Sequence, residues 1–492
     1  MPDVSKDDEI VLALGDERIT RAQFHDRALR AQAMLAGKGI GQGDRIGVAF
    51  RNRPQFFELL AAATALGATT VPIAWRLKRE EIAYLIADSG VKQVFFDADS
   101  AAQMQGFDGM SLDHYEAALS AATPAPATGD MLGNYEMFLY SSGTTGRPKA
   151  IEREAVPPEV LAKFSPGRNG LLDMLGVAGP GEVHLICGPL YHSQPIGFGG
   201  TALGAGHKVV MMEGGFDAEA CLAAIEREKV TWLTCVPTHF VRILALPSEL
   251  RSRYDVSSVK AILHSAAPCP RDVKSAIMDL FPPDAIWEVY GGTEGAMTMI
   301  SPAEWRARPG SVGRAFPPGS QIVIMDEAGN LLPAGETGLV YAHAVMKFRY
   351  KGASELDKDT WSGDYFTLGD MGYLDEEGYL FLTDRKKDMV ISGGANIYPA
   401  EVEAVLFNHP AVGDVAVIGV PDAEFGESVK AIVEPRAQVT EAEIIAFCRS
   451  HLAHYKCPRS VDFVAELPRD PSGKIRKREL REPYWQAAGR TI

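Results

Sequence analysis

Apolar and polar positions alternate in two rhythms along the first part of the chain. Short apolar runs at residues 44–50, 69–75 and 91–98 predict buried strands. The segments 54–66 and 79–90 instead have the three- to four-residue apolar spacing that is typical of helices. Strands that alternate with helices predict right-handed βαβ units and a parallel sheet covered on both faces.

The same alternation returns after residue 182, beyond an Ala-, Thr- and Pro-rich stretch at 117–129 that predicts a surface connection. No internal sequence repeat relates the two sections, so we expect two sheets within one large domain. The elements predicted in the second section are strands at 183–187, 207–212, 230–236, 259–265 and 285–290, and helices at 217–229 and 237–246.

Two further patterns complete the chain. Between about residues 311 and 383 the helical rhythm stops, and glycine turns between short apolar runs predict a β-rich annex. After it, helices at 399–409 and 440–452 and strands at 412–420, 429–434 and 460–466 predict a small α+β domain. The predicted fold class is therefore α/β, with a large N-terminal domain (1–386) of two helix-covered sheets plus the annex, and a small C-terminal α+β domain (387–492).

Composition narrows the class of function. The chain has 492 residues, 46% of them hydrophobic, and a formal charge of −15 (49 basic minus 64 acidic residues). An acidic surface argues against a nucleic-acid partner and offers no basic stripe for anionic lipid. The most membrane-like run, 59–75, is interrupted by threonines and glycine and predicts a helix followed by a strand rather than a span. Small-molecule chemistry is the expected function.

Cysteines and the N-terminus predict the compartment. The six cysteines have neither CxxC pairs nor histidines at metal-ligand spacing, which favours free thiols in a reducing compartment and no structural zinc. The sequence "MPDVSKDDEIV" lacks the apolar core of a signal peptide, and its acidic residues do not suit a mitochondrial leader. A cytoplasmic protein is predicted.

The segment "YSSGTTGRPKA" at 140–150 combines hydroxyl groups, glycines and one lysine. It is not a P-loop, because Gly143 precedes Gly146 by only three positions and Ala150 follows Lys149 where that motif has Ser or Thr. Hydroxyl groups, exposed backbone N–H groups and the lysine charge still suit a phosphate. A Gly- and Ser-rich surface turn is the alternative for this segment taken alone.

Five segments, taken in order, resemble the motifs of the adenylate-forming superfamily of acyl-CoA synthetases, firefly-type luciferases and peptide-synthetase adenylation domains. The resemblance runs from about Gly43 to Leu480 and is greatest to fatty-acyl-CoA synthetase-like ligases. The segments that carry it are "YSSGTTGRPKA" (140–150), "YGGTEG" (290–295), "YFTLGDMGYLDEEGY" (365–379), "TDRKKDMVISGGANIYPAEVE" (383–403) and "PRDPSGKIRKREL" (468–480).

The resemblance implies an enzyme that joins a carboxylic acid to ATP with Mg²⁺, releases pyrophosphate and passes the acyl group from acyl-AMP to the thiol of coenzyme A. Bringing two anions together requires positive charge and N–H donors, which the quoted segments contain. By the resemblance, Glu294 holds Mg²⁺, the segment 141–149 covers the departing phosphates, and Asp370 and Arg385 bind the ribose. The resemblance also implies that Tyr290 and the segment "SAAPCP" (265–270) lie against adenine, and that the small C-terminal domain is mobile. The full set of implied ATP contacts is Ser141, Ser142, Gly143, Thr144, Thr145, Lys149, Ala266, Ala267, Tyr290, Gly291, Gly292, Thr293, Asp370, Arg385 and Lys474.

Lys474 is implied to be the catalytic lysine that reaches the carboxylate and the α-phosphate, with Glu294, Thr145 and His192 as the other catalytic residues. Lys387 corresponds to the interdomain hinge, and Gly393 and Gly394 to the lining of the CoA tunnel. His192 lies where the family has an aromatic residue or histidine beside the reacting carboxylate. We expect the acyl pocket to be lined by His192, Gly197, Gly199, Gly200 and Gly204, although these glycines also fit close helix packing.

Four functions remain open from the sequence. The leading hypothesis is an AMP-forming acyl-CoA synthetase for a hydrophobic acid, fatty or polycyclic, with a homodimer as a possible state. A stand-alone adenylation enzyme that loads an acyl carrier protein would share the motifs, and so would a luciferase-like oxygenase. A catalytically silent ligand-binding module is the alternative of another class, and retention of Lys474, Glu294, Asp370 and Lys149 argues against it.

Overall fold

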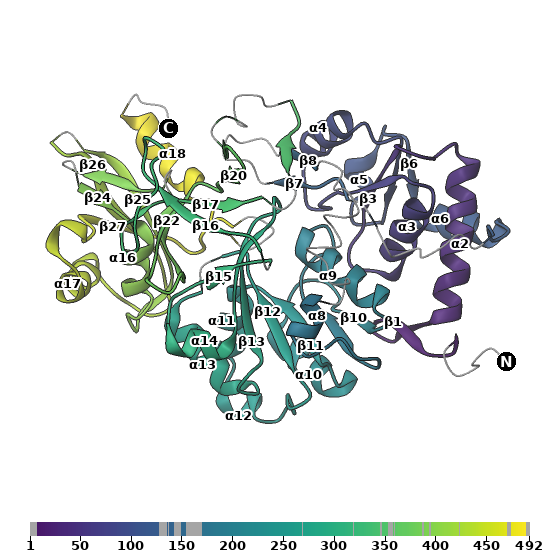
Figure 1. Ribbon diagram of the computed structural model, residues 1–492, viewed down its shortest axis with the longest axis horizontal. Helices are drawn as coiled ribbons and strands as arrows, with labels where there is room; N and C mark the ends of the chain where they lie inside the picture. Colours follow the sequence, from purple (N-terminus) through teal and green to yellow (C-terminus); the bar gives the residue numbers. More distant parts are fainter. Residues whose placement is uncertain are drawn as a thin grey trace.

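The computed structural model describes most of the chain. The described residues are 7–126, 135, 137–141, 149–153, 170–267, 269–317, 319–344, 347–352, 358, 360–385, 388–392, 395–422, 424–469 and 474–488. In Figure 1 the four-stranded sheet with its helices lies at one end of the molecule and the C-terminal elements lie at the other, with the annex strands between them.

A four-stranded parallel sheet forms in the first section, as its strand and helix rhythms predict. Its strand order is β4-β3-β5-β6. The strands are β4 (Thr69–Pro72), β3 (Arg45–Ala49), β5 (Gln93–Phe96) and β6 (Gly109–Ser111), and the helices are α2 (Arg21–Gly37), α3 (Pro54–Ala65), α4 (Arg79–Ser89), α5 (Ala101–Met104) and α6 (Leu112–Ala121).

A nine-stranded sheet forms mainly in the second section, in the order β15-β14-β13-β12-β11-β9-β10-β1-β2. Its centre is parallel, and the pairs β1–β2, β13–β14 and β14–β15 are antiparallel. The strands are β15 (Arg314–Ala315), β14 (Ala296–Ile300), β13 (Ile286–Gly291), β12 (Ala261–His264), β11 (Trp232–Cys235), β9 (Val183–Ile186), β10 (Lys208–Met211), β1 (Ile10–Leu14) and β2 (Glu17–Thr20).

The helices of the second section are short and connect the strands of the nine-stranded sheet. One continuous apolar core contains residues from α2, α3 and β3 together with residues from α9, β10 and β12, so the two sheets share one large domain, as predicted. The helices are α8 (Gly170–Met174), α9 (Ser193–Gly204), α10 (Ala218–Glu228), α11 (Pro237–Ala245), α12 (Ser248–Arg251), α13 (Arg271–Leu280) and α14 (Pro302–Ala307).

The predicted β-rich annex forms a small antiparallel sheet, and one of its strands, β18, pairs with strands from residues 140–153 in a second small sheet. One has the order β19-β20-β17-β21-β22, with β16 paired to β17, and the other has the order β18-β8-β7. The strands are β16 (Ile322–Met325), β17 (Gly338–His343), β19 (Trp361–Ser362), β20 (Tyr365–Phe366), β21 (Asp370–Leu374), β22 (Leu380–Arg385), β18 (Phe348–Tyr350), β8 (Lys149–Arg153) and β7 (Tyr140–Ser141).

The C-terminal residues have their own sheet and their own apolar core, which gives the α+β unit that the sequence predicts. The boundary at 386/387 stays a prediction, and those two residues lie outside the described ones. The elements are β23 (Val390–Ser392), β24 (Ala395–Ile397), α16 (Pro399–Leu406), β25 (Val412–Asp422), β26 (Gly426–Pro435), α17 (Glu441–His451), the 3₁₀ helix η1 (His454–Lys456), β27 (Ser460–Phe463) and α18 (Lys477–Ala487).

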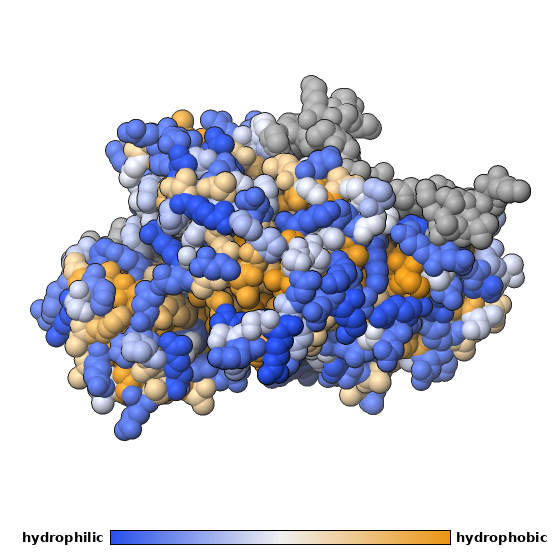
Figure 2. Space-filling model, turned by 90° about the horizontal axis from the view of Figure 1, so that it is seen from below, coloured by the Kyte–Doolittle hydropathy of each residue, from blue (hydrophilic) through white to orange (hydrophobic). Residues whose placement is uncertain are grey.

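Two sequence expectations concern cysteines and membranes. All six cysteines are free thiols, as predicted. Within the described ranges, no helix is long and apolar enough to cross a bilayer. On the face seen in Figure 2, apolar side chains form several separate spots among hydrophilic ones.

Candidate nucleotide and acyl site

The turn that carries Glu294 is the centre of the candidate site. It connects the antiparallel strands β13 and β14 and is closed by reciprocal backbone hydrogen bonds between Gly292 and Gly295, of 3.0 and 3.2 Å. A Cβ at Gly291 would lie 2.4 Å from the Gly295 carbonyl oxygen, so the tight turn requires glycine there. The motif "YGGTEG" therefore presents the half-buried Glu294 at the end of a strand.

Glu294 and Lys149 meet at one tyrosine. The Tyr350 hydroxyl donates a hydrogen bond of 2.7 Å to Glu294 Oε1, and the Lys149 ammonium lies 5.9 Å from the centre of the Tyr350 ring. This convergence depends on the antiparallel pairing of β8 with β18. Partial burial lowers the pKa of Lys149, and a phosphate beside it would favour the charged form again. The lysine end of the predicted phosphate segment thus lies close to the predicted Mg²⁺ ligand.

Arg153 supports the same turn from β8. Its guanidinium donates a 2.9 Å hydrogen bond to the backbone carbonyl of Thr293. Because Lys149 and Arg153 lie on one short strand, β8 brings two basic side chains to the turn.

Asp370 is joined to the motif from the annex. The Tyr290 hydroxyl donates a 2.6 Å hydrogen bond to Asp370 Oδ2, and Asp370 is buried at the start of β21. Asp370 and Arg385 lie opposite each other in the register of β21 and β22. The two residues predicted to bind ribose are therefore neighbours across one strand pair, beside the predicted adenine contact Tyr290.

Part of the predicted site lies outside the described residues. This holds for Ser142, Gly143, Thr144, Thr145, Lys387, Gly393 and Gly394, and for the side chains of Ser141 and Arg385. The backbones that flank two of these segments are described. Ser141 pairs with Lys149 across the β7–β8 hairpin, and β23 and β24 form a hairpin around residues 393–394.

Ala266 and Ala267 follow β12 at the edge of the nine-stranded sheet, in the segment predicted to lie against adenine. Ala266 has a φ of +78°, which a residue with a Cβ rarely adopts. The backbone of this segment is therefore held in a conformation that alanine alone would not favour.

His192 lies directly before helix α9, in contact with the Tyr191 ring at a centroid distance of 4.5 Å. The glycines of α9 differ in their surroundings. A Cβ at Gly199 would lie 2.7 Å from the Phe57 ring, and one at Gly200 would lie 2.8 Å from the Tyr135 ring, whereas Gly197 has open space around it. Gly204 is exposed at the end of the helix. Gly199 and Gly200 are therefore explained by close helix packing, one of the two interpretations from the sequence. Gly197 has room for a ligand, which fits the other interpretation.

Lys474 is half-buried and lies three residues before α18. An isolated bridge between Arg469 and Ile475 closes the predicted loop around it. Of the neighbouring basic residues, Arg476 pairs with Glu479 and Lys477 pairs with Glu403, each at 2.7 Å. Both pairs lie within the C-terminal domain, and the role of Lys474 stays a prediction.

Three residues beside the predicted site residues were not predicted from the sequence: Tyr350, Arg153 and Tyr135. Each contacts a predicted site residue or the acyl helix: Tyr350 bonds Glu294, Arg153 bonds the Thr293 carbonyl, and the Tyr135 hydroxyl donates a 2.6 Å hydrogen bond to the Gly197 carbonyl. None lies in a glycine-rich or otherwise diagnostic motif, and each acts through a contact between segments that are distant in the sequence.

The residues present fit a magnesium ion bound together with a nucleotide. The described residues contain no cluster of three or more histidine, cysteine or carboxylate side chains at metal-ligand distance. Mg²⁺ commonly takes one or two protein carboxylates and completes its six ligands with phosphate oxygens and waters. Glu294, oriented by Tyr350, suits that arrangement.

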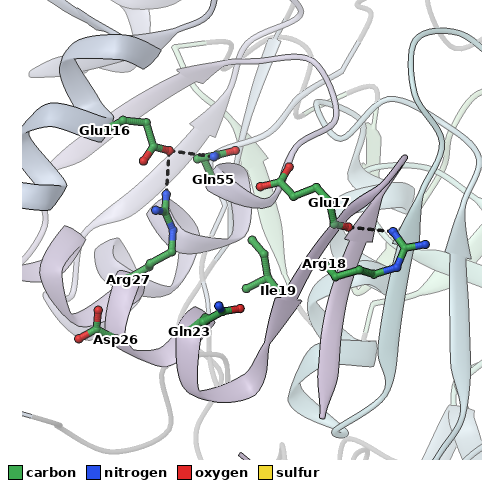
Figure 3. A pocket seen from close by; sticks show the side chains of 8 residues that line it. All are labelled: Glu17, Arg18, Ile19, Gln23, Asp26, Arg27, Gln55 and Glu116. Carbon is green, nitrogen blue, oxygen red and sulfur yellow. Dashed lines mark hydrogen bonds and ion pairs between the residues drawn. The ribbon is translucent and has the colours of Figure 1, made fainter. Parts of the chain in front are cut away.

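A separate cavity of about 440 Å³ lies away from all these residues, beside α2 and β2 (Figure 3). Several of its polar groups already contact one another: Arg27 contacts both Glu116 and the buried Glu58, and Gln55 contacts Glu116. This cavity contains no predicted site residue and is not a candidate active site.

Fold and site together define an adenylate-forming enzyme. Residues 3–347 match the family of AMP-binding enzymes, and residues 401–474 match the C-terminal domain of AMP-binding enzymes. The chain belongs to this family, and its class is that of AMP-forming acid–thiol ligases, which use ATP, Mg²⁺ and coenzyme A.

Three relatives illustrate the similarity. The chain is 32% identical to the long-chain-fatty-acid–CoA ligase FadD13 of Mycobacterium tuberculosis, over 95% of this chain and 94% of that protein. It is 34% identical to a feruloyl-CoA synthase of Amycolatopsis sp., over 96% and 95% of the two chains. The solved structure of o-succinylbenzoate CoA synthetase (MenE) from Bacillus subtilis, in complex with its acyl-adenylate intermediate, matches with a TM-score of 0.83 and 26% identity, covering 96% of this chain and 95% of that one.

Proposed function

We propose that this ligase activates a hydrophobic carboxylic acid, fatty or aromatic, as acyl-AMP and transfers the acyl group to coenzyme A in the cytoplasm. The observation that carries the choice of acid is helix α9, which follows His192 and contains no charged side chain in "SQPIGFGGTALG". An uncharged, glycine-rich helix beside the reacting carboxylate favours an apolar acyl group. The names of the relatives support this choice, because long-chain fatty acids and ferulate both carry apolar bodies.

Each half of the proposed reaction has its own residues. Lys149 and the segment 141–148 hold the phosphates, Asp370 and Arg385 hold the ribose, and Tyr290 with Ala266 and Ala267 lies against adenine. Bound Mg²⁺ neutralises phosphate charge near Glu294. Lys474 contacts the carboxylate and the α-phosphate during adenylation, and rotation about Lys387 then withdraws it and brings Gly393 and Gly394 to the pantetheine arm.

A panel of acids tests the proposal. Purified protein is mixed with ATP, Mg²⁺ and acids from two carbons to long-chain and aromatic members, and both pyrophosphate release and CoA consumption are measured. We expect both signals with apolar acids. Activity restricted to two- or three-carbon acids would refute the hydrophobic pocket.

The acceptor is tested in parallel by replacing coenzyme A with a pantetheinylated acyl carrier protein. Acyl transfer to the carrier without CoA consumption would assign a carrier-loading enzyme instead. Absence of pyrophosphate release across the whole panel would favour a ligand-binding module.

A further inference from the structure

We propose that a buried ion pair between Lys274 and Glu288, together with His264, positions the adenine-binding segment 265–270, and that these are positioning residues for ATP. This inference rests on the proposed nucleotide site. None of the three belongs to a motif that the sequence analysis singled out.

The three side chains come from three elements that meet behind the site. Glu288 lies on β13, His264 is the last residue of β12, and Lys274 lies on α13. Lys274 and His264 are fully buried, and Glu288 is 7% exposed. The Lys274 ammonium contacts Glu288 Oε2 directly, and His264 Nε2 lies 3.6 Å from the same oxygen. The Lys274–Glu288 pair thus connects strand β13 to helix α13, and His264 at the end of β12 lies beside it.

These contacts lie at both ends of the segment 265–270. His264 directly precedes the segment, and Lys274 lies in the first turn of the helix that follows it, where its backbone N–H bonds the Pro270 carbonyl at 2.9 Å. Inside the segment, burial and the Glu288 carboxylate raise the pKa of the Cys269 thiol. Glu288 also precedes Tyr290 by two residues on β13. Movement of Glu288 would therefore shift both predicted adenine contacts.

The segment needs such support because it is strained. Ala266 has a φ of +78°, and a non-glycine residue keeps such a conformation only where its surroundings hold it there. Burial and the nearby Lys274 charge lower the pKa of His264, so the imidazole is neutral and Glu288 is left to pair with Lys274. The Lys274 ammonium also lies 4.9 Å from the centre of the Trp305 ring, which fixes it from another side.

The competing explanation is that the ion pair only stabilises the fold. The energetics of buried ion pairs distinguishes this role from the positioning of the adenine-binding segment. Replacing a buried pair by apolar residues of similar size is often neutral or stabilising. The double variant Lys274→Met/Glu288→Met should therefore keep the denaturant midpoint of the wild type. If the pair positions the segment, the double variant raises the KM for ATP about tenfold and leaves the KM for the acid within about twofold. A tenfold rise in KM is the size expected when one modest positioning interaction is lost.

The control is a buried ion pair of similar kind that is remote from the nucleotide. Arg27 contacts the fully buried Glu58 at 2.6 Å, beside the cavity of Figure 3, and Arg27→Met/Glu58→Met should leave both KM values unchanged. Glu288→Asp is the second variant, because it keeps the charge and shortens its reach by one methylene. It should raise the KM for ATP several-fold even if the double variant does not fold.

Wild-type pyrophosphate release with ATP and an apolar acid is measured first. If the wild type shows none, the proposed function fails. If the wild type is active and both Glu288→Asp and the double variant bind ATP with unchanged KM, the positioning role is overturned and the function stands.

Discussion

The hydroxyl of Tyr350 donates a hydrogen bond of 2.7 Å to the carboxylate of Glu294, across 56 positions of the chain. A carboxylate held this way presents its other oxygen in a fixed direction, and that oxygen is the one available to Mg²⁺. Tyr350 therefore orients the proposed metal ligand from the neighbouring sheet.

Removing this hydroxyl should slow adenylation without unfolding the protein. We expect Tyr350→Phe to lower the rate of acyl-AMP formation about tenfold, the scale of one hydrogen bond to a charged group, and to raise the Mg²⁺ concentration needed for half-maximal rate. The measurement is pyrophosphate release at several Mg²⁺ concentrations. Tyr365→Phe is the matched control, because that hydroxyl bonds Gln321 at 2.7 Å elsewhere in the annex. An unchanged Mg²⁺ dependence in Tyr350→Phe would contradict the orienting role.

Asp370 is predicted to accept hydrogen bonds from the ribose hydroxyls. We expect Asp370→Ala to raise the KM for ATP about tenfold or more and to have little effect on the KM for an ATP analogue that lacks these hydroxyls. Steady-state kinetics with both nucleotides measures the difference. Asp364→Ala removes an annex carboxylate that pairs with Lys347 at 2.7 Å and should leave both values unchanged. Equal losses for both nucleotides in Asp370→Ala would show that the residue does not read the ribose.

Lys474 is predicted to act in one half-reaction only. Lys474→Ala should reduce acyl-AMP formation about 100-fold, the usual loss for a group that stabilises transition-state charge. Thioester formation from supplied acyl-AMP should survive. Arg476→Ala is the control, since Arg476 already pairs with Glu479. A similar fall in both half-reactions would argue against two alternating conformations of the C-terminal domain.

The sequence predicted the elements of this fold better than their pairings. Apolar periodicity placed the central parallel strands and six helices, α3, α4, α10, α11, α16 and α17. It did not place the helices α2, α6, α9, α13 and α18. It did not reveal β1 and β2 on the edge of the nine-stranded sheet, since a short strand such as "ERIT" has no diagnostic pattern.

Site residues also fall into two groups: those that local motifs indicate and those that depend on the pairing of distant segments. Glu294, Asp370 and Lys149 lie in glycine-rich motifs, where the backbone itself constrains the sequence. Tyr350 and Arg153 act through the pairing of β8 with β18, which joins segments 197 positions apart at the Arg349–Glu152 contact. In the sequence, Lys274 resembles any surface lysine of an amphipathic helix. Only the folded structure shows that it is buried and paired with Glu288. Contacts between distant segments are set by the whole fold and leave no local signal.

Helix α9 offers a pair of glycines that separates packing from acyl binding. Gly199→Ala places a methyl group 2.7 Å from the Phe57 ring and should lower the free energy of unfolding by about 1–3 kcal/mol. Gly197→Ala meets nothing within 4 Å and should be neutral or stabilising by up to about 1 kcal/mol, because alanine favours the helix. Denaturant unfolding measures both. If Gly197 lines the acyl pocket, its substitution also changes the KM for bulky acids; equal destabilisation by both variants would show that α9 is packed alike at both positions.

Buried His184 makes the stability of the protein depend on pH. Burial lowers the pKa of His184 to about 3, and its ring lies against Trp232 at a centroid distance of 3.8 Å, tilted by 34°. Above pH 6.5 the ring is neutral in both the folded and the unfolded chain, so its contribution is fully present. As the pH falls below 6.5 the unfolded chain binds a proton that the folded chain does not, and the free energy of unfolding decreases until the pH reaches the folded pKa. Between pH 6.5 and 5 this loss is at most about 2 kcal/mol.

His184→Phe should lose correspondingly less stability between pH 7 and 5 in denaturant unfolding, whereas His25→Gln, at an exposed position on α2, should follow the wild type. Identical pH profiles for wild type and His184→Phe would show that His184 does not contribute to acid sensitivity.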